Sequence, residues 1–163
     1  MSQDLNLSTS SHAMDEETAR AEVYGLLSQL LYAAPSPELL SQLQVAIDQR
    51  SDSTVVLLEG AVVAFANFYR WETGGVCAIG NVMMAPAARG RGVARYLIEQ
   101  MLDTAFTRHQ ACEVQVSCFN PNVAGLLLYP QLGFLPCGVE ERVGKSGERL
   151  ALIHFRLASP ACK

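Results

Sequence analysis

The stretch from Val82 to Ala94 constrains the fold most, because it joins an apolar run to an amphipathic segment through a turn rich in arginine and glycine. Its residues are Val-Met-Met-Ala-Pro-Ala-Ala-Arg-Gly-Arg-Gly-Val-Ala. Glycines let the backbone approach a ligand closely, and a helix beginning near Gly92 presents unpaired N–H groups and a positive dipole end to an anion. The junction therefore predicts a strand, an anion-binding turn and a helix in succession.

Other anion-binding patterns fit this stretch less well. It lacks the Gly-Lys-Ser/Thr ending of a nucleotide P-loop and the three-glycine spacing of a dinucleotide-binding fold. An arginine-glycine element that binds RNA should lie on a wider basic surface, whereas the net charge here is −4 and no second such element occurs. A plain strand–turn–helix connection, with glycines that serve only the turn, stays open as an alternative.

A second informative segment runs from Val114 to Phe134 and is typical of a strand, a capped turn, a short helix and a new strand. Asn120 or Asn122 is expected to cap the helix. Pro130 lies inside the helical pattern, so we expect the last turn to be distorted or to end there. Taken alone, Tyr129 beside leucines is typical of a core residue.

Together the two segments resemble the Gcn5-related N-acetyltransferase (GNAT) family. The pattern Arg-x-x-Gly-x-Ala at Arg89, Gly92 and Ala94 resembles its coenzyme A-binding signature. The second segment is similar to its second motif, although a glycine stands where alanine is usual, at Asn122, Gly125, Tyr129, Leu132, Gly133 and Phe134. The resemblance covers about residues 54–157.

The resemblance implies an α/β (α+β) fold with a mixed, mostly antiparallel central sheet flanked by helices. It also implies transfer of the acetyl group of acetyl-CoA to a primary amine of a small molecule or peptide by direct attack. Acetyl-CoA is the implied cosubstrate, and no metal is expected because the three histidines are scattered.

Site residues follow from the same resemblance. The backbone of Val82 and Met84 would bind the pantetheine arm and the thioester carbonyl, and Asn122 would also bind the pantetheine. Tyr129 is the candidate general acid for the coenzyme A thiolate. The pyrophosphate would be bound by the amides of Arg89, Gly90, Arg91, Gly92, Val93 and Ala94.

The general base is left open. Residues 77–81, on the strand that leads into the turn, offer no carboxylate. The alternatives are a relayed water, Glu72, Glu113, Glu140 and His154. The acceptor is expected to contact N-terminal helices and the turn formed by residues 69–72.

Periodicity divides the chain into a disordered N-terminus (1–14), a two-helix segment (15–50) and a catalytic domain (51–158). No convincing strand precedes Asp15. Strands are expected at 54–58, 61–69, 76–84, 112–118, 134–142 and 149–157, and helices at about 92–108 and after Asn120. The leucine pattern of the N-terminal helices also resembles cytoplasmic chaperones that mature molybdenum oxidoreductases, although two helices covering a sheet face is the simpler interpretation.

Cellular context is read from cysteines and apolar runs. The five cysteines are odd in number and form no Cys-x-x-Cys pair, which favours reduced thiols in a cytoplasmic protein. No apolar run is long enough to span a bilayer, and the N-terminus lacks the basic and then apolar order of a signal peptide. We expect neither nucleic-acid nor membrane partners, and the N-terminal apolar stripes leave an acceptor site or a homodimer contact open.

Two further functions therefore stay open beside the enzyme. One is a non-catalytic acyl-CoA-binding or sensory module. The other is a maturation chaperone built on the N-terminal helices.

Overall fold

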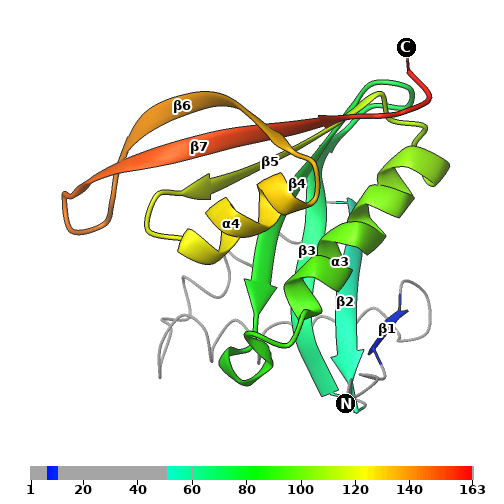
Figure 1. Cartoon of the computed structure of the whole chain (residues 1–163), viewed down its shortest axis with the longest axis horizontal. Coiled ribbons are helices and arrows are strands. Elements are labelled where there is room, and N and C mark those ends of the chain that lie inside the picture. The colour runs from blue at the N-terminus through cyan, green and yellow to red at the C-terminus, as the bar shows by residue number, and fades with distance from the viewer. Residues whose placement is uncertain (1–6, 11–50, 60, 163) are drawn as a thin grey trace. The chain divides into compact units, whose positions relative to one another are not determined.

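The computed structural model describes residues 7–10, 51–59 and 61–162 (Figure 1). The helices expected within 15–50, and most of the N-terminus expected to be disordered, lie outside these residues. The chain divides into two compact units, Met1–Tyr69 with Asn81–Met101, and Arg70–Gly80 with Leu102–Lys163. Each unit is described by itself.

The first unit is built on an antiparallel hairpin. Strand β2 (Ser51–Leu58) pairs with β3 (Ala61–Trp71), and the pair Leu58↔Ala61 closes the hairpin. Glu59, in the turn, has a left-handed φ of 52°. The strands predicted at 54–58 and 61–69 are confirmed, although β3 runs through Trp71, so residues 69–71 are strand and not the expected turn.

A strand precedes Asp15, contrary to the prediction. Strand β1 (Leu7–Ser10) pairs antiparallel with β2, from Leu7↔Leu58 to Ser10↔Val55. The serine-rich sequence resembles a disordered tail, but an edge strand is held by backbone hydrogen bonds, which do not depend on side-chain type. The prediction of disorder over 1–14 is therefore wrong for residues 7–10.

The core of the first unit comes from β3 and α3 (Val93–Asp103). Residues 64–68 of β3 are all buried. On α3 the buried residues follow helical spacing, and they are Val93, Leu97, Ile98 and Met101. This buried stripe confirms the amphipathic segment predicted after the turn. The predicted long helix changes to a π-helical turn over Thr104–Arg108.

Asn67 on β3 is fully buried, and neither its Nδ2 nor its Oδ1 has a hydrogen-bond partner within residues 7–10, 51–59 and 61–162. An unsatisfied buried polar group costs about 1–3 kcal/mol. We therefore expect Asn67→Leu, which keeps a similar shape, to raise the free energy of unfolding by about 1–3 kcal/mol in urea titrations. Asn67→Ala, which opens a cavity instead, should not stabilise. A less stable Asn67→Leu protein would contradict the interpretation.

The second unit contains the C-terminal strands and α4. Its elements are β5 (Glu113–Phe119), α4 (Val123–Gln131), β6 (Leu135–Val143) and β7 (Arg149–Ala158). Residues 76–79 of β4 (Val76–Met84) run parallel to 113–116 of β5, whereas β5 pairs antiparallel with β7, and β7 with β6. The strand order is β1-β2-β3-β4-β5-β7-β6. The mixed, mostly antiparallel sheet is confirmed.

The sheet of the second unit has one apolar and one polar face. Val114, Val116 and Cys118 of β5 are buried, and the Tyr129 ring of α4 packs on Phe155 of β7. Glu113, Gln115 and Ser117 alternate with these residues and therefore lie on the opposite face. The register pairs Ser117 with His154, so the two side chains share that polar face.

Cys112 and Cys162 form a disulfide, so the prediction of reduced thiols is wrong for this pair. The pair Glu113↔Ala158 brings the end of β7 beside the start of β5, and the Ser159 N–H donates to the Cys112 carbonyl. The two cysteines stand 50 residues apart, and only this ladder brings them together. Cys77, Cys118 and Cys137 are outside disulfides.

Candidate active site

The turn between β4 and α3 is stabilised by its own backbone. The Ala85 N–H donates to the Val63 carbonyl at 2.8 Å, which ties the end of β4 to β3. A 3-10 turn follows over Pro86–Ala88, where the Ala88 N–H donates to the Ala85 carbonyl. The chain therefore leaves the sheet in a defined direction before the two glycines.

Gly90 and Gly92 form an open backbone cradle, a name we use for residues 89–94. Their φ values are +72° and +77°, a region that side-chain-bearing residues seldom adopt. Among the residues that the structure describes, no heavy atom would lie within 4 Å of a Cβ at either position, so these residues leave the space above both glycines open. The glycines therefore satisfy the turn and leave room for a ligand.

The start of α3 supplies donors to this cradle. The Tyr96 N–H donates to the Gly92 carbonyl, so the N–H groups of Val93 and Ala94 come before the first bond within the helix. The Val93 side chain is buried and fixes the helix start, whereas Arg89 and Arg91 are exposed. Backbone donors, the helix dipole and two cations fit a pyrophosphate.

Val82 and Met84 are half-buried near the end of β4. Asn81, just before them, has a φ of 50° within the strand. Asparagine tolerates this left-handed backbone better than most residues, and such a residue interrupts strand alternation. Nothing in the sequence pattern of β4 indicated this irregularity.

Asn122 caps α4 in the second unit, which settles the choice between Asn120 and Asn122. Its Oδ1 accepts a hydrogen bond from the Gly125 N–H at 3.1 Å. A Cβ on Gly125 would lie 2.9 Å from Asn122 Nδ2 and 3.2 Å from Tyr129 Cε2. The unusual glycine is therefore explained by close packing between the cap and the tyrosine. Pro130 does not end the helix, which continues to Gln131.

Tyr129 lies on the buried face of α4 and is 3% exposed. Its ring packs against Phe134 and Phe155, with centroids 5.8 Å and 5.5 Å away. Burial, and to a lesser extent the charge of Cys118, raise the pKa of Tyr129 well above its ordinary value. The hydroxyl therefore stays protonated at neutral pH and is available as a hydrogen-bond donor.

The predicted site residues fall into two groups. Val82, Met84 and the cradle belong to the first unit, whereas Asn122 and Tyr129 belong to the second. In the second unit, Gly125 lies close to both Asn122 and Tyr129.

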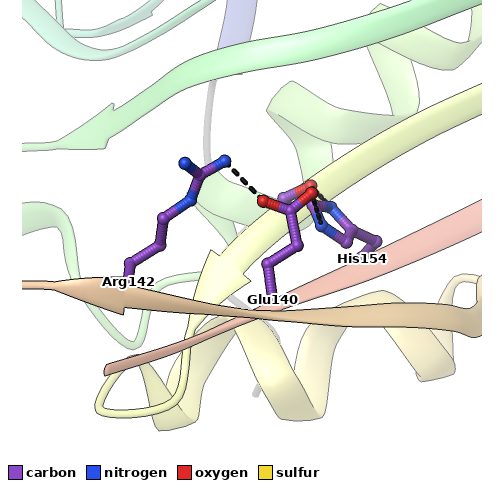
Figure 2. A network of polar contacts seen from close by, with 4 residues as sticks. Glu140, Arg142 and His154 are labelled. Carbon is purple, nitrogen blue, oxygen red and sulfur yellow. Dashed lines mark hydrogen bonds and ion pairs between the residues drawn. The ribbon is translucent and has the colours of Figure 1, made fainter. Parts of the chain in front are cut away.

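The four carboxylate and histidine alternatives for the base differ in their partners. Glu72 accepts from the Arg70 guanidinium, and Glu113 accepts from Gln115 Nε2 at 2.7 Å. Glu140 and His154 contact one another, with His154 Nε2 3.0 Å from Glu140 Oε1. Figure 2 shows Glu140 between His154 and Arg142 on the same face of the sheet.

Ser117 completes this arrangement and was missed by sequence reasoning. Its Oγ lies 2.7 Å from His154 Nδ1. We call Ser117, His154, Glu140 and Arg142 the polar chain. Within the described ranges, no group of three or more His, Cys, Asp or Glu side chains could hold a metal ion. In the same part of the protein, no helix is long and apolar enough to cross a membrane.

Comparison with known proteins finds a matching family model. Residues 16–134 match the family described as "Acetyltransferase (GNAT) family", a region that begins before the resemblance noted from the sequence. No curated protein sequence matches the chain significantly.

Solved structures share its fold. The ribosomal-protein-S18-alanine N-acetyltransferase of Escherichia coli is 19% identical with a TM-score of 0.73, and the match covers 93% of each chain. The ribosomal-protein-alanine N-acetyltransferase of Brucella melitensis is 22% identical with a TM-score of 0.74, over 93% of this chain and 99% of that one. The yncA protein of Salmonella typhimurium, solved with acetyl-CoA, is 21% identical with a TM-score of 0.68, over 96% and 98%.

Proposed function

Because the chain belongs to the acetyltransferase (GNAT) family, we propose that it transfers the acetyl group of acetyl-CoA to a primary amine of a small molecule or peptide by direct attack. The cradle is the observation that carries this proposal. Its two left-handed glycines leave open space in front of the first N–H groups of α3. That arrangement suits the pyrophosphate of coenzyme A.

The remaining predicted residues take roles within this proposal. Val82 and Met84 would bind the pantetheine arm and the thioester carbonyl through their backbone, so their side chains can be hydrophobic. The Oδ1 of Asn122 is used by the helix cap, which leaves its Nδ2 for the pantetheine. Tyr129 would donate to the departing thiolate.

The acceptor class is part of the proposal. Two relatives with the same fold are named for ribosomal-protein alanine, which makes peptides with an N-terminal alanine the first acceptors to test. Their identities of 19% and 22% support the fold alone, so small-molecule amines belong in the same screen.

Partners and location complete the proposal. We propose that the protein acts on its acceptor without binding nucleic acid or a membrane. A homodimer contact remains an alternative role for the N-terminal apolar stripes. The proposed location is the cytoplasm. The Cys112–Cys162 disulfide argues against it, since such bonds are commoner in oxidising compartments.

The test is a screen for thiol release. Acetyl-CoA would be incubated with the protein and a panel of amines that includes N-terminal alanine peptides, and free coenzyme A would be measured. We expect acetyl-CoA to bind in calorimetry and one amine class to release thiol. Binding without turnover would favour the acyl-CoA-binding module. Absence of binding would favour the chaperone built on the N-terminal helices.

A further inference from the structure

The polar chain links three strands of the second unit through consecutive hydrogen bonds. Ser117 is on β5, His154 on β7 and Glu140 on β6. Ser117 Oγ lies 2.7 Å from His154 Nδ1, and His154 Nε2 lies 3.0 Å from Glu140 Oε1. The Arg142 guanidinium binds the second oxygen of Glu140 (Figure 2). Both imidazole nitrogens are therefore engaged.

The charges fix the direction of these hydrogen bonds. Glu140, held by Arg142, is an ionised acceptor, so His154 Nε2 must carry the proton between them. Nδ1 of the neutral ring then has a lone pair and accepts from the Ser117 hydroxyl. Ser117 Oγ is left with its own lone pairs for an outside donor.

The polar chain lies on the opposite face of the sheet from Tyr129. Phe155, which packs on Tyr129, is next to His154 in β7, and Val116, its register partner, is next to Ser117 in β5. Because successive side chains of a strand point to opposite faces, the Tyr129 hydroxyl, a proton donor, lies on one face of the sheet. The polar chain, a proton acceptor, lies on the other face at the same level of β5 and β7. Acyl transfer needs both, because the amine loses a proton and the departing thiolate gains one.

We propose that Ser117, His154 and Glu140 take up the proton of the acceptor ammonium. One N–H bond of the ammonium breaks as an O–H bond forms at Ser117, while the original Ser117 O–H bond breaks and an N–H bond forms at His154 Nδ1. The imidazolium charge is balanced by Glu140. This inference rests on the proposed acetyltransferase function and assigns the general base that the sequence left open.

Charged neighbours complete the surroundings of His154. On its face of the sheet, β6 supplies Glu140 and Arg142, β5 supplies Glu113 and β7 supplies Arg156. Arg156 lies 3.9 Å from Glu113, so these two charges largely offset one another. The His154 side chain is 28% exposed, which leaves it in contact with solvent and able to return its proton.

The test compares pH–rate profiles of variants. Since the acceptor ammonium must lose a proton before its nitrogen attacks, the parent should lose activity as the pH falls. We expect His154→Gln to lower kcat by about 10²-fold at neutral pH, within the range for a positioned base. The activity should recover at high pH, where the amine is already deprotonated, and the Kd of acetyl-CoA should not change. Ser117→Ala and Glu140→Gln should show the same pattern with smaller losses.

A matched control lies on the same hairpin. Glu141 pairs with Arg149 on the opposite face of β6 and β7, so Glu141→Gln removes a comparable exposed ion pair. It should leave kcat and the pH profile unchanged. If His154→Gln and Ser117→Ala keep the parent kcat and profile, the polar chain is only structural.

Two more outcomes would overturn the inference. An acetyl group found on Ser117 by mass spectrometry, after incubation with acetyl-CoA alone, would make the serine a nucleophile. A parent protein that releases no thiol with any amine would remove the proposed function, and the inference with it. An active parent with unaffected variants removes the inference alone.

Discussion

Gly92→Asp is expected to raise the Kd of acetyl-CoA by about 10²-fold or more, because charge-assisted hydrogen bonds contribute about 1.5–3 kcal/mol each. The new carboxylate would stand where α3 begins, at the position proposed for the pyrophosphate. It would both fill the cradle and repel the phosphates. Calorimetric titration with acetyl-CoA measures the effect, and thermal unfolding checks that the protein folds.

Two further variants separate charge from backbone strain. Gly92→Ala adds a Cβ that meets no atom of the described part of the chain within 4 Å, so it tests strain at a φ of +77° without the charge. Gly147→Asp puts the same side chain at a φ of +81°, also in open space, in the β6–β7 turn. Both should bind acetyl-CoA much better than Gly92→Asp. Unchanged affinity in a folded Gly92→Asp protein would remove the cradle as the pyrophosphate site.

The cradle could be predicted because its physics is local. Strand β4 has the predicted bounds Val76–Met84, and α3 begins at Val93, one residue after the predicted start. The glycine requirement, the apolar stripe of α3 and the cap at Asn122 each depend on residues within a few positions. Short-range patterns of this kind can be recognised directly from the sequence.

Features that depend on long-range pairing were not predicted. The strand β1, the Cys112–Cys162 disulfide and the contact between Ser117 and His154 all need the strand order and its register. Glu140 and His154 were both alternatives for the base, but nothing in their spacing indicated that they contact one another. Only the ladder between β6 and β7 makes them one chain with Ser117.

Gly125 illustrates a different limit. From the sequence it was a departure from the motif, because alanine is usual at that position. In the structure a Cβ there would meet Asn122 Nδ2 at 2.9 Å, closer than real Cβ contacts allow. Glycine at position 125 therefore leaves the room that the neighbouring side chains need. A residue pattern alone does not show this packing.

Tyr129→Phe is expected to lower kcat by about 10²-fold, the lower end of the range for a positioned acid. We expect the lower end of this range because burial raises the pKa of Tyr129 and so makes its hydroxyl a weaker acid. Its hydroxyl would mainly stabilise the developing thiolate by donating a hydrogen bond. Because the pKa is raised, the hydroxyl stays protonated, so the variant should not remove a basic limb from the pH–rate profile.

Stability and binding measurements separate this role from a structural one. Phenylalanine keeps the ring contacts with Phe134 and Phe155, so Tyr129→Phe should bind acetyl-CoA and unfold almost as the parent does. Phe134→Leu is the converse control, since it removes a ring contact and keeps the hydroxyl. If Phe134→Leu lowers kcat as much as Tyr129→Phe, packing and not the hydroxyl governs turnover. An unchanged kcat in Tyr129→Phe would leave Tyr129 with a structural role only, because packing alone accounts for a buried tyrosine beside two phenylalanines.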